Sequence, residues 1–121
     1  MSVVQNPIAA AVISALDDLV FAIQAAGCPC TRNDQDFQPP AAIVTPPSFV
    51  GGTLAGLTVN VPVYFVAPDT GMAGWEQIME LYGRAYHALG SRDAVSTLWV
   101  SPLNPDGLPA YLVSVTITIE G

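Results

Sequence analysis

The stretch Tyr111–Glu120 (YLVSVTITIE) decides how the rest of the chain has to fold. Apolar and polar residues alternate along it, and the side chains of a β-strand point alternately to the two faces of a sheet. One face would carry Tyr111, Val113, Val115, Ile117 and Ile119, and the other Ser114, Thr116, Thr118 and Glu120. The pattern predicts a strand with one buried face, which a second layer has to cover.

The residues before this strand predict its partner. Thr97–Ser101 (TLWVS) is typical of a short strand, and Asn104-Pro105-Asp106-Gly107 is a strong turn signal. We expect the two strands to pair as a hairpin across Asp106-Gly107, with Asp106 at its tip.

Two earlier segments are also predicted to be strands. Leu57–Ala67 (LTVNVPVYFVA) is β-branched and aromatic, and one of its faces would carry Val59, Val61, Val63 and Phe65. Ala41–Thr45 lies between two proline pairs. Because proline cannot donate a ladder hydrogen bond, the flanking prolines predict an edge position for 41–45, and Pro62 predicts an edge or a bulge in 57–67.

Apolar residues at three- and four-residue steps predict two helices. The first begins at Asn6-Pro7, an N-cap followed by a proline at the first helical position, and ends at Gly27. Its apolar stripe is Ile8, Val12, Leu16, Leu19, Val20 and Ile23. The second runs from about Ala73 to Leu89, where Gly90 ends it, and its stripe is Trp75, Ile78, Met79, Tyr82 and Tyr86.

These elements predict a single α+β domain over residues 1–121. We expect a mixed, mostly antiparallel sheet of about four strands with both helices packed on one face. The opposite face would be rich in serine and threonine, and suited to water or to a neighbouring subunit.

Ser48–Gly56 (SFVGGTLAG) predicts a flexible loop, because it is rich in glycine. It also carries the apolar residues Phe49, Val50 and Leu54, which we consider candidate interface residues together with Asp106. The alternative is ordinary packing of the loop on the core, with Asp106 in an ordinary turn.

The composition excludes some classes of partner. The chain has no lysine and only three arginines against ten carboxylates, for a net charge of −7, which does not suit binding to nucleic acid phosphates. Asp17 and Asp18 interrupt the apolar N-terminal run and argue against a signal peptide or a membrane span. Hydrophobic residues make up 51% and charged residues 11%, which fits either a surface covered by partners or a monomer with an uncharged polar surface.

No residue pattern predicts a cofactor, a metal ion or an active site. Cys28 and Cys30 flank Pro29 too closely for an unstrained disulfide, and we interpret them as reduced thiols. His87 is the only histidine, so neither a catalytic triad nor a multi-histidine metal site is evident. We therefore expect a protein that assembles rather than an enzyme.

Asp69-Thr70-Gly71 is the one segment that matches a known catalytic motif. Small dimeric aspartic proteases present their catalytic carboxylate in such a tripeptide, and the reaction needs two of them together. Here Pro68 precedes the aspartate and a predicted helix follows directly. Capping of that helix by Asp69 or Thr70 explains the same residues.

The whole layout resembles the tail terminator proteins of long-tailed, siphovirus-type bacteriophages, especially those of actinobacteria. The similar features are the N-terminal helix from about residue 7, the segment QPPAAIVTPPSF, the strand TVNVPVYFVAPD, the helix GWEQIMELYGRAYHAL and the closing strands that end in YLVSVTITIEG. The similarity spans nearly the full length.

The resemblance implies a virion structural protein, assembled in the host cytoplasm, that forms a homohexameric ring at the head-proximal end of the tail. Such a ring stops polymerisation of the tail tube, contacts the major tail tube protein and gives the head-completion or connector protein a docking surface. DNA would cross its lumen without specific binding. A head-closure or connector-stopper protein of the neck is the alternative, and a dimeric aspartic protease that uses Asp69 is a remote one.

Overall fold

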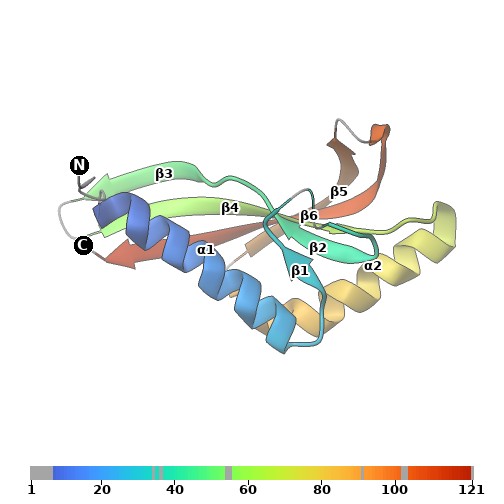
Figure 1. The fold of residues 1–121 in the computed structure, drawn as a ribbon, viewed down its shortest axis with the longest axis horizontal. Coiled ribbons are helices and arrows are strands. Elements are labelled where there is room, and N and C mark those ends of the chain that lie inside the picture. The colour runs from blue at the N-terminus through green and yellow to red at the C-terminus, as the bar shows by residue number, and fades with distance from the viewer. Residues whose placement is uncertain are drawn as a thin grey trace.

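The structure is a computed structural model, and it describes residues 7–33, 35, 37–53, 56–90, 92–101 and 104–120. Two helices and six strands make up the fold (Figure 1). In chain order they are α1 (Pro7–Ala25), β1 (Cys30–Thr31), β2 (Ala41–Val44), β3 (Ser48–Thr53), β4 (Gly56–Val66), α2 (Gly71–Ala85), β5 (Arg92–Ser101) and β6 (Asn104–Glu120), and a 3₁₀ turn over Tyr86–Ala88 follows α2.

The strands form one mixed sheet in the order β1-β2-β4-β6-β5, and β3 also pairs with β4. Only β1 and β2 are parallel, and the other pairings are antiparallel. The predicted α+β class is confirmed. The sheet has more strands than the four we expected, because β1 is only two residues long and the glycine-rich β3 gave no strand pattern.

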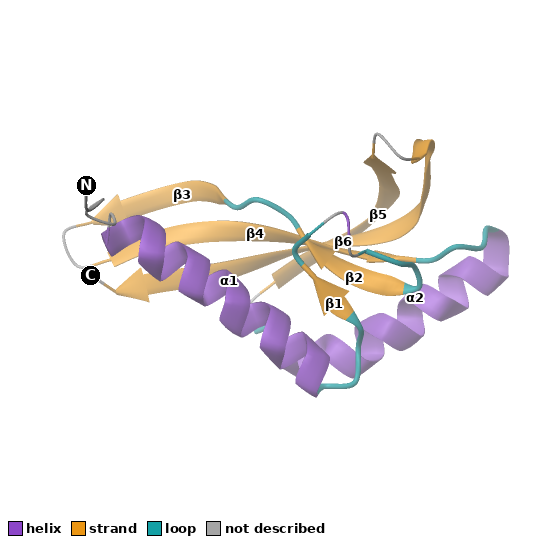
Figure 2. Ribbon diagram, in the orientation of Figure 1, coloured by secondary structure: helices purple, strands orange, loops and turns teal. Residues whose placement is uncertain are grey.

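Both helices lie on one face of the sheet, as predicted (Figure 2). The main core joins α1 and α2 to the alternate residues of β4 and β6. Its buried members in these elements are Val12, Leu16, Leu19, Ile23, Ile78, Leu81, Ala85, Val59, Val61, Val63, Phe65, Val113 and Val115. The faces predicted from the period of two are therefore confirmed.

The helix ends follow the predicted glycines. Gly27 has a φ of +93° after α1, and the Cys28 amide donates to the Ile23 carbonyl at 3.2 Å, which is the long hydrogen bond of a Schellman motif. Gly90 has a φ of +67° beyond the 3₁₀ turn that ends the second helical segment. These conformations favour glycine because it lacks a Cβ.

The predicted edge position of 41–45 is wrong, and 57–67 has neither the edge position nor the bulge that Pro62 predicts, because its pairing with β6 is unbroken. β2 lies between β1 and β4, and β4 lies inside the sheet beside β6. β2 pairs with β4 from Val63 onwards and β3 pairs with it up to Asn60, so Pro62 faces the gap between β2 and β3. The missing N–H of Pro62 therefore costs no ladder hydrogen bond, while its carbonyl accepts the Thr45 amide at 2.9 Å.

The predicted loop over Ser48–Gly56 is also wrong. Ser48–Thr53 is strand β3, whose backbone pairs with β4 at Phe49↔Val59, and the register shifts at Val50. Gly51 and Gly52 are tolerated because the neighbouring strand supplies their hydrogen bonds. Leu54 lies outside the described residues.

The hairpin between β5 and β6 is confirmed, but its reversal does not lie at Asp106-Gly107. Ser101 pairs with Asn104, so Asp106 lies within β6 and not at the tip. The segment Asn104-Pro105-Asp106-Gly107 instead forms an irregularity in the pairing of β5 with β6. Gly107 has a φ of +81°, and the register shifts on the opposite strand between Trp99 and Ser101.

The sheet face away from the helices is only partly polar. Thr116 donates its hydroxyl to Asn60 Oδ1 at 3.1 Å there, as a serine- and threonine-rich face predicts. Towards the other end of β4 a second cluster of buried residues covers this face, formed by Ile43, Val66 and Ala110, against which Phe37, Tyr64 and Leu108 pack. The expected serine- and threonine-rich face is therefore replaced by apolar residues in this part.

Candidate interaction surface

The second helix exposes part of the stripe that we expected to be buried. Ile78 is buried, but Trp75 is 54% exposed and Tyr86 is also exposed. The buried face is instead Gly74, Ile78, Leu81 and Ala85. The apolar residues of α2 extend over more of the helix surface than the sheet covers, so the pattern alone could not show which of them face the core.

A close approach at Gly74 fixes the rotation of α2. A Cβ added to Gly74 would collide with the Asp69 carbonyl and lie 3.4 Å from Pro109 Cγ in β6. The first turn of α2 therefore packs against the preceding loop and against the sheet with no side chain between them. Trp75 is the next residue along the helix, which turns its indole about 100° away from this contact.

Exposed apolar residues lie on both α2 and β5, and we refer to three of them together as the α2–β5 surface: Met72, Trp75 and Leu98. Met72 is 68% exposed and Leu98 is 56% exposed. Leu98 pairs directly with Pro109, whose ring lies near Gly74, so Leu98 is on the sheet face that carries α2. Val95, also exposed, is on the opposite face of β5, because it is an odd number of residues away.

The interface residues predicted from the sequence do not form one site. Phe49 and Val50 belong to β3, on the far side of β4 from the hairpin that contains Asp106. Met72, Val95 and Leu98 were not predicted as exposed. For Val95 and Leu98 the sequence contained one indication of an exposed contact surface. The stretch from Ala94 to Ser101 (AVSTLWVS) has no charged residue in a strongly acidic chain.

Asp69, the first residue of the Asp69-Thr70-Gly71 motif, lies outside the regular elements. It is exposed in the loop before α2, and Gln77 Nε2 donates to its Oδ2 at 2.8 Å. Thr70 is the N-cap residue, but no side-chain hydrogen bond caps the helix, so the predicted capping by Asp69 or Thr70 is wrong. Asp69 instead ties the loop to the second turn of α2.

The two thiols are buried, and burial disfavours their thiolate forms. Both cysteines are free, and burial raises the pKa of Cys28 from 9.0 to about 11 and that of Cys30 to about 12. The positive charge of Arg84 acts against this increase at Cys28. A thiol that stays protonated is a poor nucleophile and a poor metal ligand.

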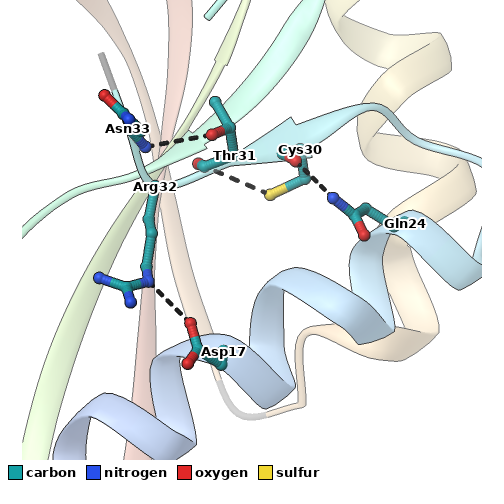
Figure 3. A network of polar contacts seen from close by, with 6 residues as sticks. All are labelled: Asp17, Gln24, Cys30, Thr31, Arg32 and Asn33. Carbon is teal, nitrogen blue, oxygen red and sulfur yellow. Dashed lines mark hydrogen bonds and ion pairs between the residues drawn. The ribbon is translucent and has the colours of Figure 1, made fainter. Parts of the chain in front are cut away.

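Polar contacts around β1 join it to α1 (Figure 3). Gln24 Nε2 donates to the Cys30 carbonyl at 2.8 Å, and Arg32 Nε donates to Asp17 Oδ1 at 2.7 Å. Arg84 bridges the two helical segments in a similar way, because it donates to the Gly27 carbonyl at 3.2 Å and to Glu80 at 2.6 Å. Both ion pairs are about half exposed, so each contributes little to stability while it links neighbouring elements.

Within the part of the chain that the structure describes, no group of three metal-ligating side chains comes together, and neither helix has the length and apolarity needed to cross a membrane. Comparisons with protein-family models, with curated proteins and with solved structures give no match.

Proposed function

We propose that this chain is a structural protein of long-tailed bacteriophage virions, a tail terminator that forms a hexameric ring at the head-proximal end of the tail. The observation that carries the proposal is the α2–β5 surface, where Met72, Trp75 and Leu98 are each more than half exposed. Large apolar side chains exposed on a small chain favour a partner that covers them. The choice of partners rests on the resemblance of the sequence layout to tail terminators.

In this role the ring stops polymerisation of the tail tube and binds the major tail tube protein on one side and the head-completion or connector protein on the other. The net charge of −7 supports a lumen that repels DNA, so that DNA passes without specific binding. The protein would assemble in the host cytoplasm and remain in the virion.

A head-closure or connector-stopper protein is the alternative within the same neck, and it would use the same kind of surface. The number of subunits in the ring and the identity of the bound partner separate the two. The remote alternative, a dimeric aspartic protease, needs Asp69 as a catalytic carboxylate. Loss of cleavage of an unstructured substrate on Asp69→Asn would favour it.

The experiment is the particle mass of the purified chain over a wide concentration range, with negative-stain images of the largest species. The measurements should be repeated in the presence of tail tubes, because a terminator can stay monomeric until it meets the tube and form its ring there. A six-subunit ring, free or on tube ends, would support the proposal. A compact dimer that cleaves peptides would contradict it, and a ring of another size that binds only the connector would favour the alternative.

A further inference from the structure

The last strand extends past its neighbour and leaves an open sheet edge. The pairing of β5 with β6 ends at Arg92↔Val115, whereas the pairing of β4 with β6 continues to Glu120. On the side where β5 lies, Thr116–Glu120 thus has no partner strand among the described residues. We call these five residues the open edge.

The backbone groups that point out of the open edge can be identified. The Pro62 carbonyl accepts the Thr45 amide, so the polar groups of Pro62 point away from β6, and those of its partner Ser114 point towards β5. Outward groups then recur at every second residue, which places those of Thr116 and Thr118 on the open edge. An extended strand is the chemical partner that such groups fit.

An apolar groove runs beside this edge. It has a volume of about 460 Å³ and lies between α1 and the end of β6. Its lining includes Ala15, Leu19 and Ala22 from α1, Leu89 after α2, and Ile117 from β6. A strand added at the open edge would therefore place alternate side chains in an apolar site.

The same chain carries a strand suited to that site. The β5–β6 hairpin extends beyond β4, whose pairing with β6 ends at Val66↔Ala110, and its end bends away from the helices (Figure 1). We call 98–101 with 104–109 the arm. A hairpin with no further strand beside it is marginally stable in water, so the arm gains most from a partner. Its outer strand is uncharged from Ala94 to Ser101 and exposes Leu98.

We propose that the arm of one copy binds a second copy, with β5 lying as an added strand along the open edge and Leu98 contacting the groove. The proposal rests on the proposed function for the choice of a second copy as the partner. The two contacting surfaces differ, so the contact is head-to-tail, and repetition of such a contact closes a ring when the rotation allows.

Charge favours this choice of surfaces. Each copy carries a net charge of −7, so two copies repel one another over most of their surfaces. The outer strand of the arm and the apolar groove are regions where contact brings few like charges together. Asp18 lines the groove and Glu120 ends the open edge, and the uncharged outer strand adds no further carboxylate beside either.

The test uses one variant for each surface. Leu98→Asp damages the arm, and Thr118→Pro removes an outward amide of the open edge while leaving the β4 ladder intact. Phe21→Asp is the matched control, because Phe21 is 68% exposed on α1, does not line the groove and gains the same charge. Ser96→Pro and Ala22→Glu replace the first two variants if far-UV circular dichroism shows that either has lost its fold.

We expect the wild type and Phe21→Asp to assemble in concentrated solution, and each surface variant alone to be monomeric. An equimolar mixture of Leu98→Asp with Thr118→Pro should form a dimer and nothing larger, because one intact arm meets one intact edge. The mixture is the decisive measurement. If the two substitutions had weakened association in a general way, the mixed variants would stay monomeric.

Rings formed by both surface variants would overturn this interface and leave the proposed function standing. A mixture that stays monomeric while the wild type assembles would also overturn this interface and leave the proposed function standing. A wild type that stays monomeric at every soluble concentration would also overturn it, whereas rings that form only on tail tubes would still support the terminator role.

Discussion

The fold changes the chemistry of Cys28 and Cys30 by burying their thiols. Burial holds both thiols protonated, with pKa values of about 11 and about 12 instead of 9.0. We predict that in the folded protein both react with a disulfide reagent at pH 8 at least about tenfold more slowly than in the urea-unfolded chain, because the thiolate is the attacking species. Stopped-flow absorbance measures both rates, and equal rates would show that the thiols are accessible.

The same pKa changes predict how stability depends on pH. The unfolded chain loses its thiol protons near pH 9, and the folded chain retains them until about pH 11 or above. The contribution of the thiols is thus fully present below pH 9 and is lost as the pH rises from about 9 to about 11 for Cys28 and to about 12 for Cys30. Urea unfolding of the wild type should show a steeper loss of stability over this window than unfolding of the Cys28→Ala, Cys30→Ala double variant. Parallel curves would contradict the prediction.

At the scale of the element, two glycines of α2 make a matched pair. A Cβ at Gly74 would collide with the Asp69 carbonyl, whereas nothing lies within 4 Å of a Cβ at Gly83. We predict that Gly74→Ala lowers the free energy of unfolding by about 1–3 kcal/mol, as overpacking does. Gly83→Ala should raise it by about 0.5–1 kcal/mol, because alanine restricts the unfolded chain and favours helix.

Urea denaturation of the two variants beside the wild type measures both effects. The sign of the difference is the informative quantity, because both changes add one methyl group to the same helix. A Gly74→Ala variant as stable as Gly83→Ala would mean that α2 does not pack closely against the loop at Asp69.

The sequence predicted correctly those elements in which the burial of a single face determines the spacing of apolar residues. α1 and the strand over 111–120 each follow a single burial face, and their spacing showed it. β3 was missed because its glycines pair through backbone groups, which leave no side-chain pattern. The position of β4 was missed because an inner strand can contain a proline where two neighbouring strands leave a gap, as at Pro62.

The exposed surface was less predictable than the core for a similar reason. Trp75 fits the apolar stripe of α2, and only the backbone contact of Gly74 with the preceding loop turns it outwards. That contact joins residues whose packing depends on the whole sheet. The candidate interface therefore emerged from tertiary structure, while its uncharged strand over Ala94–Ser101 was visible in the sequence.

At the scale of the whole molecule, charge should govern assembly. Ten carboxylates against three arginines make every copy repel the next, whereas the proposed contact is apolar and made by backbone hydrogen bonds. Salt shortens the Debye length from about 30 Å at 0.01 M to about 10 Å at 0.1 M, which weakens the repulsion and leaves the contact unchanged. We predict that self-association strengthens as sodium chloride rises over this range, and that the Leu98→Asp variant shows no such gain. Sedimentation equilibrium at several salt concentrations measures both. An assembly held by ion pairs would instead weaken with added salt, and that result would move the interface away from the arm and the open edge.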